Sequence, residues 1–131
     1  MSIHTIVHFE IPAKNVKKLS AFYTRCFGWK FEHAPIPGMD YWLTSTGPVG
    51  KGVTGGMYRK MGPKDGIRNY ISVDDIDAAI RTFRAAGGKQ VVPKMAVPEM
   101  GWSFVGTDPE GNLVALFEPT SRRRAATRRK K

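Results

Sequence analysis

The chain has 131 residues, of which 41% are apolar, with one cysteine and a formal net charge of +10. This length fits one domain that buries an ordinary core without disulfides, and no segment approaches the run of about 18 apolar residues that a membrane-spanning helix needs. The lone Cys26 excludes an internal disulfide, and no basic segment leads into an apolar run at the start of the chain, so we expect a cytoplasmic protein.

The first half of the chain predicts a strand, a helix and three further strands. Residues 6–12 are typical of a strand, and Asn15 can cap a helix whose apolar residues recur at i, i+3, i+4 and i+7. This stripe places Cys26 on the buried face, and Gly28 ends the helix because glycine readily adopts a positive φ. Short β-type runs follow around residues 30–33, 41–45 and 52–58.

The second half predicts the same order of elements. Residues 69–73 are typical of a strand, and Asp74 or Asp75 can cap a helix that ends before Gly87 and Gly88. Pro93 and Pro98 are expected between strands, where a missing N–H does little harm. Further β-type runs lie around residues 90–92, 102–106 and 113–118, with a turn at residues 108–111 before the last of them.

The two halves align with each other, without a gap, at an offset of 60 residues. This register persists through a helix, a loop and several strands, which predicts two copies of one unit. The linker between the copies is predicted at residues 59–67, which are rich in glycine and lysine. The matched pairs are Ile11 with Ile71, Val16 with Ile76, Tyr23 with Phe83, Gly28 with Gly88, Trp42 with Trp102, and Val53 with Leu113.

Most of the net charge lies at the C-terminus. Residues 122–131 contain seven lysine or arginine residues and no acid, so residues 1–121 are only mildly basic. We expect this tail to be disordered through like-charge repulsion. It either solvates the protein or makes non-specific contacts with nucleic acid or an anionic surface, and both alternatives stay open.

Three segments carry a resemblance to a known family. Residues 22–29, residues 70–79 and residues 108–113, in this order within the repeat, closely resemble the signature of the vicinal oxygen chelate superfamily, which includes glyoxalases, bleomycin resistance proteins and extradiol dioxygenases. The resemblance covers residues 3–118. It implies an α+β fold in which two tandem βαβββ modules, residues 1–58 and 68–121, form a mixed, half-open barrel. It also implies a ligand site inside this cup and a homodimer.

Metal enzymes of this superfamily take one ligand from the first strand and one from the last strand of each module. The resemblance places these positions at His8, Gly55, Arg68 and Ala115, and of these only His8 can bind a divalent cation. A catalytic site needs about three protein ligands, and an arginine opposes a cation. We therefore expect no metal and no cofactor. Glu118 is expected to point away from the cup.

Alternation along the strands predicts which side chains line the cup. The candidate ligand-binding residues are His8, Glu10, Trp42, Met57, Arg68, Tyr70 and Phe117. Arg68 has two open interpretations: it forms an ion pair with Glu10, or it receives a carboxylate, phosphate or enolate oxygen of a small ligand.

These residues support three alternative functions. The leading one is a small-molecule binding protein of the superfamily that lacks the usual metal site. If its ligand is anionic, Arg68 would bind the anionic group. The second is an enzyme with an atypical site, a glyoxalase-like lyase or isomerase or a dioxygenase, in which His8 or Glu10 is the base and Arg68 the electrophile. The third is a nucleic-acid-associated protein that works through its tail. No catalytic residue can be assigned.

Overall fold

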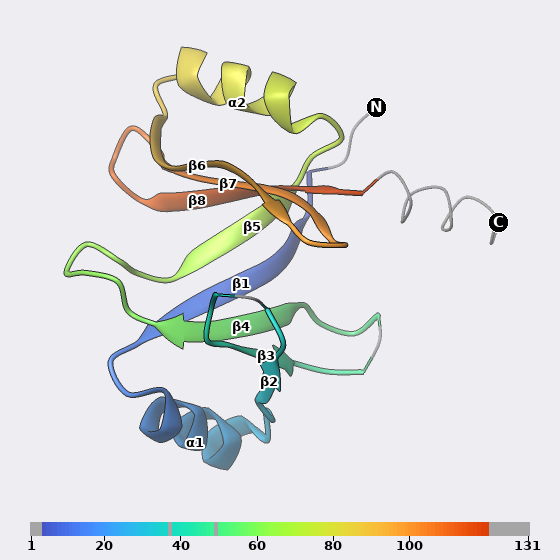
Figure 1. Cartoon of the computed structure of the whole chain (residues 1–131), viewed down its shortest axis with the longest axis vertical. Helices are drawn as coiled ribbons and strands as arrows, with labels where there is room; N and C mark the ends of the chain where they lie inside the picture. The colour runs from blue at the N-terminus through green and yellow to red at the C-terminus, as the bar shows by residue number, and fades with distance from the viewer. Residues whose placement is uncertain (1–3, 37, 49, 121–131) are drawn as a thin grey trace, which may run out of the picture. The chain divides into compact units, whose positions relative to one another are not determined.

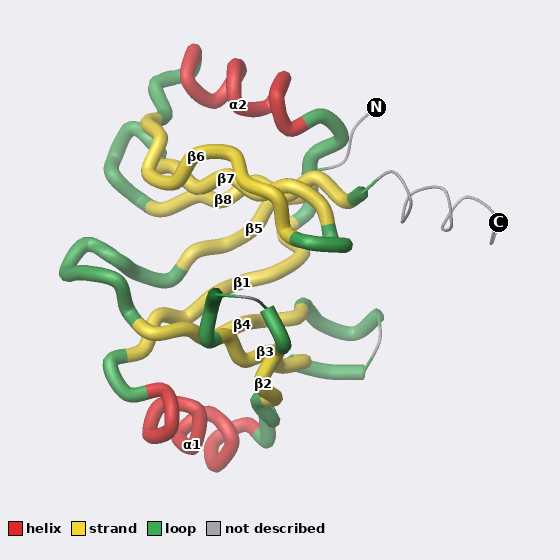
Figure 2. The backbone as a smooth tube through the Cα atoms, in the orientation of Figure 1, coloured by secondary structure: helices red, strands yellow, loops and turns green. Residues whose placement is uncertain are grey.

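The computed structural model describes residues 4–36, 38–48 and 50–120. These residues form two helices and eight strands, in two successive groups that each consist of a strand, a helix and three further strands. Figure 1 and Figure 2 trace this order along the chain. Backbone contacts divide them into an N-terminal unit, residues 7–69, and a C-terminal unit, residues 70–120 together with residues 4–6. The predicted α+β class is confirmed.

The N-terminal unit is a four-stranded mixed sheet with one helix. Its strands lie in the order β2-β3-β4-β1, with β1 parallel to β4 and the other neighbours antiparallel. The elements are β1 (Ile6–Ala13), α1 (Val16–Phe27), β2 (Glu32–Ala34), β3 (Tyr41–Ser45) and β4 (Thr54–Arg59). The C-terminal unit repeats the pattern in the order β5-β8-β7-β6. Its elements are β5 (Arg68–Ser72), α2 (Ile76–Ala85), β6 (Lys89–Val97), β7 (Gly101–Thr107) and β8 (Leu113–Pro119). The first two residues of β5, Arg68 and Asn69, still belong to the N-terminal unit.

Each helix begins and ends for local reasons. Asn15 accepts a hydrogen bond from the Lys18 N–H, and Gly28 closes α1 with a φ of 75°. Asp75 caps α2 through the Ala78 N–H, which settles the choice between Asp74 and Asp75. Both helices therefore start where the sequence predicted.

Each sheet buries one face against its own helix. In the N-terminal unit, Ile11, Ala13 and Met57 form this core, packed by Val16, Leu19 and Tyr23 of α1. In the C-terminal unit the core centres on the fully buried Phe104 and Ile76. Figure 1 shows α1 and α2 each covering the sheet of its own unit. The opposite face of each sheet does not contact the helix of its unit.

Some details of the sequence prediction were wrong. Cys26 is exposed, because α1 buries only the Val16, Leu19 and Tyr23 side of its apolar stripe and leaves Phe22 outside. Strand β6 is longer than predicted and contains Pro93, which lies at a shift in the pairing of β6 with β7. A proline is tolerated there because β6 is an edge strand and the ladder is already interrupted.

The repeat slips by one residue in the last strand. Trp42 pairs with Met57, whereas its equivalent Trp102 pairs with Glu118, so the offset between β4 and β8 is 61 and not 60. A one-residue slip turns every side chain of a strand to the other face. Thr54, and not Gly55, is therefore the equivalent of Ala115.

The basic tail, predicted at residues 122–131, lies outside the described residues. Within the part of the chain that the structure describes, no helix is long and apolar enough to cross a membrane.

Candidate functional site

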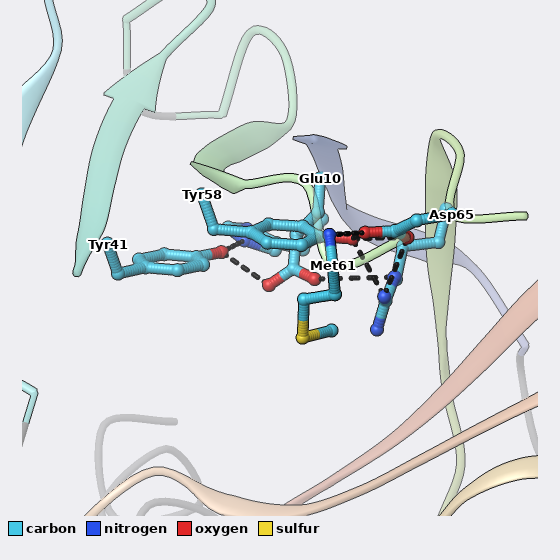
Figure 3. Close-up of polar contacts among 7 residues, drawn as sticks. Glu10, Tyr41, Tyr58, Met61 and Asp65 are labelled. Carbon is cyan, nitrogen blue, oxygen red and sulfur yellow. Dashed lines mark hydrogen bonds and ion pairs between the residues drawn. The ribbon is translucent and has the colours of Figure 1, made fainter. Parts of the chain in front are cut away.

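A polar network covers the face of the N-terminal sheet that points away from α1. Figure 3 shows Glu10 at its centre, with Tyr41 on one side and Asp65 on the other, and with the Tyr58 side chain pointing toward Asp65. These side chains come from β1, β3, β4 and the connection that follows β4. Tyr41 and Tyr58 are cross-strand partners, so their rings lie on the same face.

The Tyr41 hydroxyl joins His8 and Glu10, the two candidate site residues of β1. It donates a hydrogen bond to Glu10 Oε2 at 2.6 Å and lies 2.7 Å from His8 Nε2. Strand β4 allows this position because it has glycine at residue 56: a Cβ there would collide with the Tyr41 hydroxyl. The Tyr41 hydroxyl thus occupies the space that a side chain at residue 56 would take.

The tautomer of His8 follows from its neighbours. Because Tyr41 gives its single proton to Glu10, His8 Nε2 must donate to the Tyr41 oxygen, and Nδ1 accepts from the Thr54 hydroxyl at 2.8 Å. Burial lowers the pKa of His8, although the nearby Glu10 carboxylate opposes this shift. His8 is therefore a neutral imidazole near pH 7, and the donors run in one direction from Thr54 to Glu10.

Arg68 is held on the other side of Glu10. It is only 6% exposed, and its Nη2 donates to Asp65 Oδ1 at 3.1 Å and to the Tyr58 hydroxyl at 2.7 Å. Its Nε lies 3.9 Å from Glu10 Oε1. The guanidinium also lies over the Tyr58 ring, 5.1 Å from its centroid. Arg68 is thus fixed by two carboxylates and a tyrosine.

Asp65 and Tyr58 reinforce this arrangement. Burial raises the pKa of Asp65, but hydrogen bonds from Tyr58, from the Met61 N–H and from Arg68 outweigh it, so the pKa is below its ordinary value. Burial and the hydrogen bond to Asp65 raise the pKa of Tyr58. Asp65 is therefore a carboxylate and Tyr58 a neutral phenol at physiological pH. Of the two interpretations of Arg68, the geometry favours the ion pair.

The structure brings together three of the seven predicted ligand-binding residues, His8, Glu10 and Arg68. Met57 lies on the opposite face, in the core under α1, because β4 is shifted by one residue from the predicted register. Trp42, its cross-strand partner on β3, packs against the same core and not in the polar network. Tyr70 and Phe117 belong to the C-terminal unit, where both are partly buried. Their side chains alternate with Ile71 and Leu116, which face α2.

Sequence reasoning missed Tyr41, Tyr58 and Asp65. The two tyrosines could have been found from the pairing of β3 with β4, which requires the register of that hairpin. Asp65 lies in the segment interpreted as a linker, and the only sequence signal was its position three residues before Arg68. Glu118 points to the helix side as expected, where it accepts a hydrogen bond from the Ile76 N–H at 2.8 Å.

The residues at the metal positions of the superfamily do not fit a metal. These positions are occupied by His8, Thr54, Arg68 and Ala115. Thr54 replaces the predicted Gly55, because Gly55 faces Phe9 on the helix side of the sheet. A buried guanidinium is a fixed positive charge, and a cation between His8 and Glu10 would have to displace the Tyr41 hydroxyl. Among the described residues no cluster of three or more His, Cys, Asp or Glu side chains could hold a metal ion.

Comparison with known proteins agrees with this fold. The family model described as Glyoxalase/Bleomycin resistance protein/Dioxygenase superfamily matches residues 5–116. A glyoxylase-like domain-containing protein of Didymella fabae is 35% identical over 113 residues, which is 82% of this chain and 88% of that protein. The chain belongs to this superfamily, as the sequence resemblance predicted.

Two further relatives are more distant or longer. CFP32 of Mycobacterium bovis, a protein named as a glyoxylase, is 30% identical over 101 residues, and the match spans 74% of this chain but only 39% of that protein. The crystal structure of methylmalonyl-CoA epimerase from Mycobacterium tuberculosis superposes with a TM-score of 0.67 at 19% identity, over 92% of this chain and 91% of that chain. At this identity the likeness shows the fold alone.

Proposed function

We propose that the chain is a metal-independent, small-molecule binding member of the superfamily, whose ligand lies against the sheet face that carries His8, Glu10 and Arg68. The observation that carries the proposal is the Tyr41 hydroxyl, which bridges His8 Nε2 and Glu10 Oε2. His8 and Glu10, the side chains that would face a cation, are instead joined through Tyr41, and Glu10 also forms an ion pair with Arg68. A connected polar network of this kind gives a binding surface fixed hydrogen-bonding directions.

The charge of the network bears on the kind of ligand. Glu10 and Asp65 are both close to Arg68, at 3.9 Å and 3.1 Å, so two carboxylates face one guanidinium. Neutral His8 adds no positive charge. An anionic ligand, which Arg68 alone would favour, would meet a site with an excess of one negative charge. The geometry supports a neutral polar ligand that donates a hydrogen bond to Glu10.

Native mass spectrometry for a retained ligand, followed by melting curves with neutral amides, alcohols and small carboxylates, tests the proposal. Stabilisation by a neutral donor that disappears in Glu10→Gln, and persists in the exposed-turn control Glu110→Gln, is expected. Stabilisation by carboxylates that is undiminished in Glu10→Gln would contradict the ligand class. Metal-dependent ligand binding would contradict the proposal as a whole.

A second candidate is metal-free acid–base catalysis, favoured by the chain of hydrogen bonds from Thr54 through His8 and Tyr41 to Glu10. Such a chain can supply or accept a proton at the Glu10 carboxylate. Incorporation of deuterium from solvent into small carbonyl compounds measures this activity. Incorporation lost in Glu10→Gln and in Tyr41→Phe supports catalysis, and no incorporation by the parent protein speaks against it.

The expected homodimer, cytoplasmic location and nucleic-acid contact through residues 122–131 remain part of this proposal. The family resemblance supports the dimer, the lone cysteine supports a reducing compartment, and the charge of the tail supports the contact. Light scattering of the full chain, at a concentration of tens of micromolar, tests the dimer, and a monomer there would contradict it.

A further inference from the structure

A hollow lies in the N-terminal unit, on the helix side of its sheet and away from the polar network. It has a volume of about 460 Å³ and lies where β1 passes into α1, beside the end of β4. Its cationic lining residues are Lys14, Lys17 and Arg59, and its aromatic ones are Phe31 and Trp42. Figure 1 shows α1 beneath β1 and β4 in this unit.

The positive charge of this hollow has no counterpart in the lining. None of Lys14, Lys17 and Arg59 forms a salt bridge or side-chain hydrogen bond within residues 4–36, 38–48 and 50–120, and the lining contains no Asp or Glu. The sequence from residue 11 to residue 31 has no acid at all. Like charges gathered around a hollow repel each other, and a bound anion relieves this repulsion.

The three cations come from three places in the unit: the turn between β1 and α1, the start of α1 and the end of β4. Arg59 ends β4 and is paired with Ala13 at the end of β1, so Lys14, the next residue, lies close by. Lys17 is in the first turn of α1, where the equivalent turn of α2 has Asp77. This placement follows from the fold of the whole unit and does not depend on a single helix end.

The aromatic part of the lining packs against the core of the unit. Phe31 and Trp42 are partly buried and pack against the core of Ile11, Ala13 and Met57. The core therefore positions both rings, and both line the same hollow as the cations. Asn15 and Ser20 add polar groups to the same lining. A pocket with a few charged groups next to aromatic walls is typical of small-ligand sites.

We propose that this hollow binds a small ligand in which an anionic group, a phosphate or a carboxylate, is attached to an aromatic ring. Lys14, Lys17 and Arg59 receive the anion, and the ring packs against Trp42 and Phe31. The site is separate from the face that carries His8 and Glu10, because Trp42 and Met57 point to the other side of the sheet. The inference does not rest on the proposed function of that face.

Calorimetric titration of the full chain with phenyl phosphate, and separately with benzoate, tests the inference. We expect saturable binding of at least one probe at one site per chain. The double variant Lys17→Glu with Arg59→Glu should bind at least about tenfold more weakly, since two charge-assisted contacts are reversed. The matched control, Arg81→Glu with Lys89→Glu, makes the same charge change on exposed residues of the C-terminal unit and should stay within about twofold of the parent.

The variants and a ringless probe complete the test. If the double variant does not fold by circular dichroism, Lys17→Gln with Arg59→Gln removes the charges without adding acids and should show the same direction. Methyl phosphate should bind several times more weakly than phenyl phosphate, because it has no ring to pack. Equal losses in the control, equal affinity of methyl phosphate, or no saturable binding of either aromatic probe would overturn the inference.

Discussion

Removing the Arg68 side chain tests the ion-pair interpretation. Arg68→Ala leaves two carboxylates, Asp65 and Glu10, without their guanidinium, and their side chains are only 7% and 13% exposed. Removal of one partner from a buried pair costs about 3–5 kcal/mol. Asp65 keeps hydrogen bonds from Tyr58 and from the Met61 N–H, so we expect the lower end, about 3 kcal/mol.

A double-mutant cycle separates the stranded charge from lost packing. Asp65→Asn in the Arg68→Ala background removes the unpaired carboxylate and should recover at least about 1 kcal/mol of that loss. Glu10→Gln in the same background should recover less, because Arg68 Nε is 3.9 Å from Glu10 whereas Nη2 is 3.1 Å from Asp65. Urea unfolding followed by tryptophan fluorescence gives the free energies, with exposed Arg81→Ala as the control.

The two possible outcomes differ clearly. A loss of about 3 kcal/mol lowers the melting temperature by roughly 10 °C for a chain of this size. An Arg68→Ala protein as stable as the parent, or a double variant whose losses simply add, would refute the view that Asp65 and Glu10 hold Arg68 as a buried pair.

Three further outcomes are expected. Gly56→Ala should cost about 1–3 kcal/mol by displacing Tyr41, whereas Gly62→Ala, whose Cβ would meet no atom within 4 Å, should stay within about 0.5 kcal/mol; equal effects would remove the assigned role of Gly56. Because burial lowers the pKa of His8 in the folded protein, stability should fall as the pH drops below the unfolded value of about 6.5, and His8→Gln should flatten this part of the urea-unfolding profile; an unchanged profile would contradict a buried neutral imidazole. Truncation after Ser121 should abolish most salt-sensitive nucleic-acid binding in gel-shift assays while the melting temperature is kept, and salt-insensitive binding that survives truncation would place recognition in the folded part.

The parts of the fold that depend on local chemistry could be predicted from the sequence. Asn15, Asp75 and Gly28 mark helix ends through their own side chains or backbone freedom, and the offset of 60 places both helices correctly. The face of β4 could not be predicted in this way. Its register is set by pairing with β1 and β3, and the slip of one residue turned Met57 toward the core.

The candidate site shows the same limit. His8 and Glu10 could be placed on one face because alternation along a strand is a local rule, and the repeat offset of 60 made Arg68 the equivalent of His8. Asp65 could not, because it reaches Arg68 through the path of the connection after β4, which no periodicity describes. The exposure of Cys26 likewise depends on how α1 is rotated against its sheet, and the apolar stripe alone was wider than the buried face.

Metal analysis of the full chain, purified without chelator and without immobilised nickel, tests the metal-independent site most directly. We predict well under one equivalent of any transition metal per chain, with a melting temperature that a chelator leaves unchanged, because Tyr41 and Arg68 satisfy the groups that a cation would need. One tightly held metal ion per chain, lost in His8→Ala together with ligand binding or activity, would contradict the account.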